Sequence, residues 1–584
     1  MKIIGISGLE TSMDFKRRHW PGLEEREYRM SQGHDAAAVL VVDGKIVAGA
    51  AEERFDLKKH SPKFPIGAIN FCLREAGLRI DDLDEIAHGF DYSRYGKMFS
   101  ADAVGAERYR QVFSPEALYD RVQANLPGFP ATKVVQVPHH LAHAASAYFT
   151  SGWDECLVLV IDGMGESQSA SLYKAQAGTL TPLQQISAHD SIGILYSLVT
   201  LHLGFDFNSD EYKIMGLAPY GDPERYRAFF DEAVRLNDGG TIQIPALRLN
   251  KTADERENYL ATRRYLAERL IAERRPDQET TQDHCDVAAS LQACLDRTLQ
   301  HIAADFGRQT GLRRLAMAGG VALNCTANGK LMQSGAFDEI YVQAASGDDG
   351  SALGAALYRA SLNGGVDNRR MPVPFLGPKY SHDDVETVLS AFAERINVTR
   401  FASLEEACAS AADQIARGKV LAWHRGRMEF GPRALGNRSI LADPGHPEMR
   451  DRINAMVKKR EAFRPFAPAV SAEQVHQWFD VPEGTELPYM IMIVDVKAEH
   501  RASLPAITHV NGSARVQTVS CRDNPEFHRL LQHVGQRTGR EMVLNTSFNV
   551  KGQPMVNSPR EAVETFLGTG IDALYLEHAL LTRR

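Results

Sequence analysis

Two histidines at helical spacing, together with an aspartate that ends an apolar run, could hold a divalent metal ion. His139 and His143 lie in "HHLAHAASAY", and in a helix their Cβ atoms would be about 5–6 Å apart on one face. Asp162 ends the run "CLVLVID" and supplies a carboxylate. Imidazoles completed by a carboxylate are common ligands of divalent metals. The histidines could instead only cap or pack a helix, and the pair alone does not decide between these interpretations.

Three glycine-rich turns that follow apolar segments could bind a nucleotide. They are "VIDGMGE", "MAGGVALN" and "ASGDDGSALG". Glycine lets backbone amides approach phosphate oxygens, and the start of a following helix favours negative charge. Such turns are often only tight connections, and the chain has neither a Walker A sequence nor a GxGxxG after its first strand. Together with the His–Asp set, they predict a nucleotide held between the two halves of a split α/β domain.

Cationic side chains concentrate in two later segments, "HRGRMEFGPRALGNR" and "KKREAFRPF". Guanidinium groups bind phosphates bidentately and can hold two anionic substrates close together. A solvated basic surface is the usual explanation for such clusters. Interleaved glycine, proline and aromatic residues favour an anion-binding site, because plain surface helices seldom contain them.

The elements that must position these residues alternate between strands and helices. Strands are expected at "KIIGISG", on both sides of a turn at Asp43-Gly44, and at "KVVQV", "CLVLVID", "VLAWH", "YMIMIVDV" and "EMVLNTSF". Helices are expected at "IGAINFCLREAGL", at the histidines and from Arg256 to about Arg308. This alternation predicts an α/β fold. Glycine and proline become dense near residues 364–380 without any internal repeat, so we expect domains at 1–364 and 375–584.

Composition excludes several classes of protein. The 584 residues are 44% hydrophobic and 24% charged, with a net charge of -8 and no long run of one sign, which argues against general nucleic-acid binding. Seven scattered cysteines without a CxxC pair indicate reduced thiols rather than a disulfide framework. No stretch reaches the roughly 18 apolar residues of a membrane span, and we expect a cytoplasmic protein with no membrane or nucleic-acid partner.

An ordered series of motifs resembles the NodU/CmcH-type carbamoyltransferase family over nearly the whole chain. It includes "GHDAAAVLVVDG", "HHLAHAASAY", "EYKIMGLAPYG", "GGVALN", "SGDDGSALGAAL", "RMEFGPRALGNRSILADP" and "LNTSFNVKGQP". The resemblance implies an ATP-dependent enzyme that carbamoylates a hydroxyl group of a small secondary metabolite. It also implies an actin/hexokinase-like split α/β domain fused to an α/β domain resembling threonylcarbamoyl-AMP synthase.

By this resemblance, the carboxy-terminal domain converts carbamoyl phosphate and ATP to carbamoyl adenylate and releases pyrophosphate. The implied binding residues are Arg425, Arg433, Arg438, Lys458, Arg464, Arg515, Asn545, Ser547 and Asn549. The adenylate then passes to the amino-terminal domain, where the implied adenylate-binding residues are Gly163, Gly319, Gly320 and Asn324. For the asparagines and the serine, ordinary turn chemistry is the alternative.

The resemblance also implies a metal, usually iron(II) in this family, although another divalent metal could replace it and Mg²⁺ could accompany ATP. The implied ligands are His139, His143, Asp162 and Asp348, with Asp349 as the alternative register. The metal would act on the adenylate as a Lewis acid, without a redox role.

Three further residues carry implied catalytic roles. His34 in "SQGHDAAAV" would be the general base for the acceptor hydroxyl, with Asp35 beside it to orient or stabilise the ring. Lys213 would help to place substrate or phosphate. Alternatively, His34 only satisfies a backbone group and Lys213 is a solvated loop lysine.

Residues 9–32, "LETSMDFKRRHWPGLEEREYRMSQ", form an insertion-like segment beside His34 and are expected to shape the acceptor pocket. The acceptor itself stays open between sugar, alkaloid and polyketide hydroxyls or a nitrogen, and a homodimer is plausible. Two other functions would use some of the same features. A tRNA-threonylcarbamoylating enzyme would not be expected to carry the fused "FGPRALGNR" signature, and a non-enzymatic nucleotide-binding regulator would not need the His–Asp set.

Overall fold

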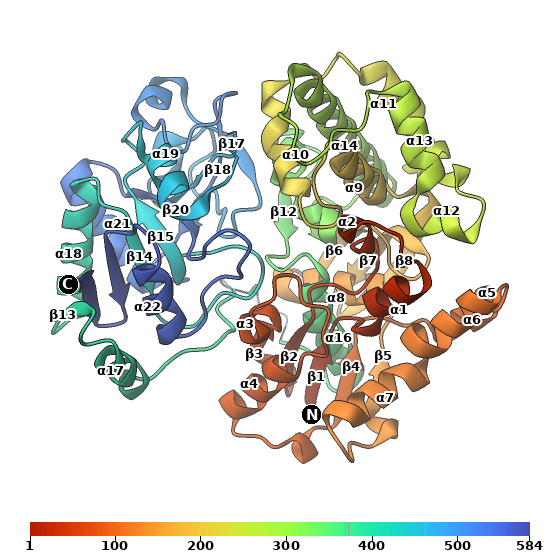
Figure 1. The fold of residues 1–584 in the computed structure, drawn as a ribbon, viewed down its shortest axis with the longest axis horizontal. Helices are drawn as coiled ribbons and strands as arrows, with labels where there is room; N and C mark the ends of the chain where they lie inside the picture. Colours follow the sequence, from red (N-terminus) through yellow and green to blue (C-terminus); the bar gives the residue numbers. More distant parts are fainter. Residues whose placement is uncertain (368–369, 372–373, 462) are drawn as a thin grey trace. The chain divides into compact units, whose positions relative to one another are not determined.

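The computed structural model describes residues 1–367, 370–371, 374–461 and 463–584. The chain forms two compact units. Unit 1 comprises residues 1–56 and 60–371, and unit 2 comprises residues 57–59 and 372–584. Each unit has its own sheets and helices, and each is described separately below (Figure 1).

Unit 1 contains two five-stranded mixed sheets with the same topology. The first has the order β3-β2-β1-β4-β5, with β1 Lys2–Ile6, β2 Ala37–Val42, β3 Lys45–Ala51, β4 Glu85–His88 and β5 Val134–Gln136. The second has the order β8-β7-β6-β11-β12, with β6 Glu155–Ile161, β7 Gln168–Gln176, β8 Thr179–Ser187, β11 Arg314–Ala318 and β12 Glu339–Val342. In each sheet the first three strands are antiparallel neighbours, and the last two add parallel to the first strand. This duplicated topology confirms the predicted actin/hexokinase-like split α/β fold.

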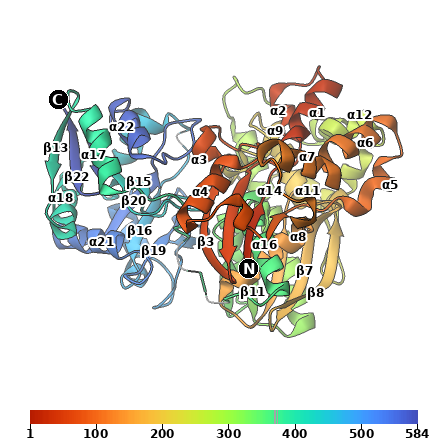
Figure 2. The ribbon, with the colours of Figure 1, turned by 90° about the horizontal axis from the view of Figure 1, so that it is seen from below.

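Two helices lie between these sheets, and each packs on the sheet to which the strand before it does not belong. α8 (His139–Ser151) follows β5 of the first sheet but packs on β6 and β11 of the second. α16 (Asp348–Leu362) follows β12 of the second sheet but packs on β1 and β2 of the first. The two helices pack against each other near the centre of unit 1 (Figures 1 and 2). At Gly354 of α16, an added Cβ would lie 1.7 Å from the carbonyl oxygen of Ala142, so only glycine permits this approach.

Other helices cover the remaining faces of the sheets. α4 (Ile66–Ala76) and α7 (Pro115–Asn125) bury apolar side chains against β1, β2 and β4. In the part of unit 1 that follows β8 in the chain, α14 (Gln282–Thr310) packs with α10 (Glu211–Leu217), α11 (Arg227–Ala233) and α15 (Cys325–Gln333). Further elements of unit 1 are α1 Thr11–His19, α2 Glu25–Tyr28, α3 Glu53–Asp56, α5 Gly96–Phe99, α6 Ala103–Arg108, α9 Ile192–His202, α12 Ala253–Asn258, α13 Leu260–Arg269, β9 Arg235–Asn237 and β10 Thr241–Gln243. Among the described residues, no helix combines the length and apolar character that a membrane crossing requires.

Unit 2 is built on one eight-stranded mixed sheet of order β13-β22-β21-β14-β15-β20-β16-β19. Its strands are β13 Ile396–Arg400, β14 Leu421–His424, β15 Arg438–Ala442, β16 Ala467–Ser471, β19 Gln517–Val519, β20 Met542–Ser547, β21 Ala573–Leu576 and β22 Ala579–Arg583. α18 (Leu404–Ala416) and α21 (Pro525–Thr538) form a core with Trp423, Leu441 and Val543 of the sheet. The other elements are α17 His382–Ala391, α19 Met449–Ile453, α20 Val475–Trp478, α22 Pro559–Leu567, β17 Ile493–Asp495 and β18 Ser513–Arg515. Unit 2 is thus an α/β unit, as predicted.

Candidate functional site

Four of the predicted metal ligands meet where α8, β6 and α16 come together. His139 begins α8, His143 lies one turn later, Asp162 follows β6, and Asp348 begins α16. The Nε2 atoms of the two histidines are 3.1 Å apart. His139 Nε2 lies 3.4 Å from Asp162 Oδ2 and 3.5 Å from Asp348 Oδ1. One potential ligand atom from each residue lies within 4.8 Å of all the others.

Neighbouring groups fix the orientation of these ligands. His139 Nδ1 faces the carbonyl oxygen of Gly89 at 2.9 Å, and its ring stacks on Phe90 with centroids 4.0 Å apart. Because Nδ1 donates to this carbonyl, the neutral ring presents its Nε2 lone pair to the cluster. The backbone N–H of Gly320 donates to Asp162 Oδ1 at 2.9 Å and leaves Oδ2 facing His139. Such second contacts are typical of metal-ligating histidines and carboxylates, so the donor set fits a divalent metal.

The electrostatics of the cluster also favour a cation. Burial lowers the pKa of His139, but Asp348 and Asp162 outweigh it and raise that pKa well above its usual value. Burial and the neighbouring His139 lower the pKa of His143 well below its usual value. These shifts favour the charged form of His139 and the neutral form of His143, beside the buried Asp162 and the partly exposed Asp348. A divalent cation would balance this charge with both imidazoles neutral.

The structure separates Asp348 from its neighbour Asp349. Asp348 faces the histidines, whereas Asp349 Oδ1 accepts a hydrogen bond from the backbone N–H of Gly350 at 3.0 Å. Burial, followed by the charge of Asp35, raises the pKa of Asp349 to about 7. Asp348 is therefore the residue of this pair that lies in the cluster.

Three of the four predicted adenylate-binding residues border this cluster. Gly319 has a φ of 96°, and a Cβ there would lie 2.3 Å from the carbonyl oxygen of Ile161, so the turn packs directly on β6. Gly320 contacts Asp162, and a Cβ on Gly163 would meet nothing within 4 Å. Asn324 instead caps α15, and its side chain also exchanges two hydrogen bonds with Gln292, both 3.0 Å long. Its adenylate-binding role stays a prediction.

The three predicted catalytic residues have distinct surroundings. His34 is 5% exposed, and burial lowers its pKa to about 4, so the ring is neutral at pH 7. Its Nε2 has no hydrogen-bond partner among the residues that the structure describes. Asp35 Oδ1 lies 2.8 Å from Nδ1 of His60, and its charge also acts on His34. Lys213 Nζ donates to Asp210 at 2.8 Å, so a carboxylate neutralises this ammonium group.

Sequence reasoning missed two residues at this site. His60 contacts Asp35, and its backbone N–H donates to Glu53 at 2.8 Å, yet no motif pointed to it. Glu166 Oε1 accepts the backbone N–H of His139 at 2.9 Å and so supports the start of α8. Glu166 ends the motif "VIDGMGE", and an acid inside a quoted motif was the available signal.

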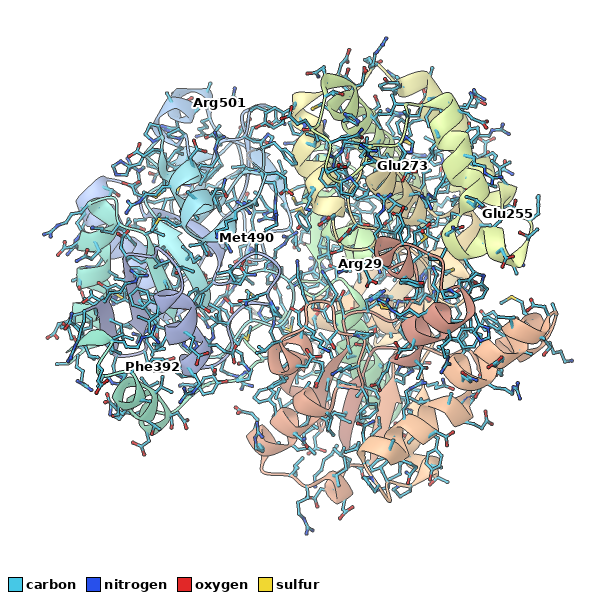
Figure 3. The ribbon with its side chains drawn as sticks, in the orientation of Figure 1. Arg29, Glu255, Glu273, Phe392, Met490 and Arg501 are labelled. Carbon is cyan, nitrogen blue, oxygen red and sulfur yellow. The ribbon has the colours of Figure 1, made fainter. Side chains whose placement is uncertain are left out.

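The segment 9–32 folds into α1 and α2 and reaches the loop that follows β6. The Gln32 amide donates to the carbonyl oxygens of Met164 at 2.8 Å and Gly165 at 3.0 Å, two and three residues after Asp162. Arg26 of α2 forms an ion pair with Glu273, which is labelled in Figure 3, at 3.0 Å. The Gln32 contacts place the end of this segment beside the loop that follows Asp162, and its role in shaping the acceptor pocket stays a prediction.

In unit 2 the structure brings together three of the predicted anion-binding residues. Lys458 Nζ donates to the carbonyl oxygen of Ser547 at 2.5 Å and to Asn549 Oδ1 at 2.7 Å. Burial, with a smaller effect from Arg460 and Arg464, lowers the pKa of Lys458 well below its usual value. A bound anion would offset this repulsion and keep the lysine charged.

The guanidinium of Arg438, a predicted anion-binding residue, contacts backbone carbonyl groups, and its role in anion binding stays a prediction. Arg438 is fully buried at the start of β15, and its guanidinium donates to the carbonyl oxygens of residues 378, 425, 426, 437 and 557. These contacts use its five N–H groups, so the residue ties together the segments around β14 and β15.

The other predicted residues of unit 2 are dispersed. Arg425 donates to Glu526 at 2.7 Å, and Arg464 faces Glu461 at 3.5 Å. Arg433 lies partly exposed in the loop before β15, and Arg515 ends β18 in a separate ribbon. Asn545 is buried on β20 and donates to Gln517. Their roles in binding stay predictions.

Comparisons with known proteins cover both units. The family model described as Carbamoyltransferase N-terminus matches residues 29–357, and the one described as Carbamoyltransferase C-terminus matches residues 412–583. The nodulation protein NolNO of Sinorhizobium fredii is 40% identical over 94% of this chain and 79% of its own length. The 3'-hydroxymethylcephem-O-carbamoyltransferase of Streptomyces clavuligerus is 37% identical over 43% of this chain and 45% of its own. Component A of the Acidaminococcus fermentans (R)-2-hydroxyglutaryl-CoA dehydratase matches 62% of this chain and 100% of its own, with 15% identity and a TM-score of 0.31.

Proposed function

The chain belongs to the carbamoyltransferase family, and from this premise we propose that it is an ATP-dependent O-carbamoyltransferase. Its substrates would be carbamoyl phosphate, ATP and a small molecule with a free hydroxyl group. Unit 2 would form carbamoyl adenylate, and unit 1 would transfer the carbamoyl group. The convergence of His139, His143, Asp162 and Asp348, in a chain that matches both halves of the family, carries this proposal.

The activation step would use the basic residues of unit 2. Lys458, positioned by Ser547 and Asn549, and the nearby Arg464 supply positive charge for the phosphates. Carbamoyl phosphate and ATP together contain four phosphorus atoms, of which carbamoyl adenylate keeps one and pyrophosphate two. Phosphorus balance therefore requires release of one orthophosphate, with water entering as the co-reactant.

The transfer step would use the residues around the four-ligand cluster. A metal held by His139, His143, Asp162 and Asp348 would supply Lewis acidity, neutralising the adenylate phosphate and polarising the carbamoyl carbonyl. His34 is neutral and buried, so its Nε2 can accept the proton of the acceptor hydroxyl. The hydroxyl oxygen then bonds to the carbamoyl carbon as the bond to the AMP oxygen breaks, giving the carbamate ester and AMP.

The test is pyrophosphate release from ATP with and without carbamoyl phosphate, in the absence of acceptor and with iron(II) supplied. We expect release only when carbamoyl phosphate is present, accompanied by one orthophosphate per pyrophosphate. Nucleotide binding without carbamoyl phosphate-dependent release would refute the proposal.

A further inference from the structure

Glu429 holds the loop that contains the motif "FGPRALGNR" but uses only one of its two carboxylate oxygens. Oε1 accepts the backbone N–H groups of Leu435 at 2.8 Å, Asn437 at 2.9 Å and Arg438 at 3.2 Å. The side chain is buried, and Oε2 has no hydrogen-bond partner within the described part of the chain. Because a buried carboxylate oxygen without a donor is destabilising, a ligand that supplies one is the natural explanation.

A second buried acceptor lies next to the same loop. Asn545 Nδ2 donates to Gln517 Oε1 at 2.9 Å and to the carbonyl oxygen of Ala434 at 3.4 Å. With its amide nitrogen fixed in this way, its Oδ1 points elsewhere and has no partner in the ranges that the structure describes. Gln517 also donates to the carbonyl oxygen of Leu435 at 2.8 Å, and the N–H of Leu435 donates to Glu429. The two acceptors are therefore fixed to one short piece of loop.

The two acceptors adjoin the predicted anion-binding residues. Asn545 and Ser547 are two residues apart on β20, so their side chains share one face about 7 Å apart. Ser547 contacts Lys458. A ligand with an anionic end and an N–H donor a short distance away fits this arrangement. In carbamoyl phosphate one carbon and one oxygen separate the amide nitrogen from phosphorus, whereas in ATP the ribose and the purine separate the adenine amino group from the phosphates.

We propose that Glu429 Oε2 and Asn545 Oδ1 accept the two N–H bonds of the carbamoyl group and so select carbamoyl phosphate over acyl phosphates that lack an amide. This assignment rests on the proposed function. It makes Glu429 a specificity-determining residue rather than only an anchor of the loop.

The sharpest variant is Glu429→Gln, which keeps an oxygen for the three loop N–H groups and replaces the other oxygen by an N–H donor. Loss of a hydrogen bond to a charged group should raise the KM for carbamoyl phosphate roughly 10- to 100-fold in the pyrophosphate-release assay. The KM for ATP should change less than about twofold, since the adenine would not touch this residue. Acetyl phosphate, which has a methyl group in place of the amide, should inhibit the variant and the wild type equally. The control is Glu561→Gln, because Asn557 and Ser558 already pair both oxygens of Glu561.

Three results would overturn the assignment. In Glu429→Gln, the preference for carbamoyl over acetyl phosphate could be unchanged, or the KM for ATP could rise while that for carbamoyl phosphate does not. The third is a lower melting temperature with unchanged kinetics. If Glu429→Gln does not fold, Asn545→Ser tests the same preference, because the shorter side chain withdraws the oxygen. If the wild type releases no pyrophosphate, the proposed function fails. Calorimetric binding of carbamoyl and acetyl phosphate to wild type and variant then tests the selectivity separately.

Discussion

Gly354 lets α8 and α16 approach closely enough to form the four-ligand cluster, and its replacement by alanine should be destabilising. The new Cβ would lie 1.7 Å from the carbonyl oxygen of Ala142 and 2.9 Å from the backbone nitrogen of Ser146. In an exposed helix, Gly→Ala is favourable by about 1 kcal/mol. Overpacking usually costs about 1–3 kcal/mol, and here the clash is with backbone, which cannot rotate away. Taking the upper end of that cost, about 3 kcal/mol, less the gain of about 1 kcal/mol, we expect a net loss of about 2 kcal/mol.

The assay is thermal unfolding of Gly354→Ala followed by measurement of bound metal. The helices must separate to relieve the clash, which moves His139 and His143 away from Asp348, so metal content should fall together with the melting temperature. The control is Gly307→Ala in α14, where the nearest atom to a new Cβ is a side-chain carbon of Phe337 at 3.1 Å. A Gly354→Ala protein that melts at the wild-type temperature would refute this account of the helix crossing.

Five further variants, in three experiments, test the site and one buried carboxyl. Asp348→Asn should weaken metal binding at least about 100-fold, beyond the 10–100-fold typical of supporting residues, while Asp349→Asn should retain metal; equal losses would contradict the geometry. His34→Asn should keep pyrophosphate release and lower carbamoyl transfer to the acceptor about 100-fold or more. Arg464→Ala should instead abolish pyrophosphate release. Equal loss of both steps in a folded His34→Asn protein would exclude His34 as the general base. Burial raises the pKa of Glu52 from 4.5 to about 7, so the folded state binds a proton that the unfolded chain has lost. Stability should therefore fall as pH rises from 4.5 to 7; Glu52→Gln should flatten this slope in denaturation curves, and an unchanged slope would contradict it.

Three of the four ligands in the cluster of unit 1 were predictable because local patterns position them. Four-residue spacing places His139 and His143 on one helical face, and the apolar run before Asp162 forms β6 and ends at the sheet edge. The hairpin at Asp43-Gly44 was equally local, and the structure confirms it between β2 and β3. The resemblance added Asp348, which no local pattern connects to the histidines.

Features that depend on distant partners were not predictable in this way. The duplicated sheets of unit 1 share strand order rather than sequence, so the amino-acid sequence shows no internal repeat. The segment 489–496 was predicted to be a strand, but the strand covers only Ile493–Asp495, which pairs with the three residues of β18, and Val496 adds a single bridge to Phe479. His60 reaches Asp35 only because the chain turns back after β3, and His60 itself lies outside every motif that the sequence shows.

Arg438 illustrates the limit for charged residues. Its motif contains four arginines that look equivalent as phosphate ligands, and the following "SILA" reads as an ordinary apolar run. In the structure this run is β15, buried from its first residue, so the arginine that begins it is buried as well. A buried guanidinium needs a full set of acceptors, and carbonyl groups from residues as far apart as 378 and 557 supply them. Whether an arginine contacts a substrate or backbone carbonyl groups of its own chain thus depends on residues far along the chain. Glu429, which accepts the backbone N–H of Arg438, has a buried Oε2 without a hydrogen-bond donor among the described residues, so it is the better indicator of where a ligand binds.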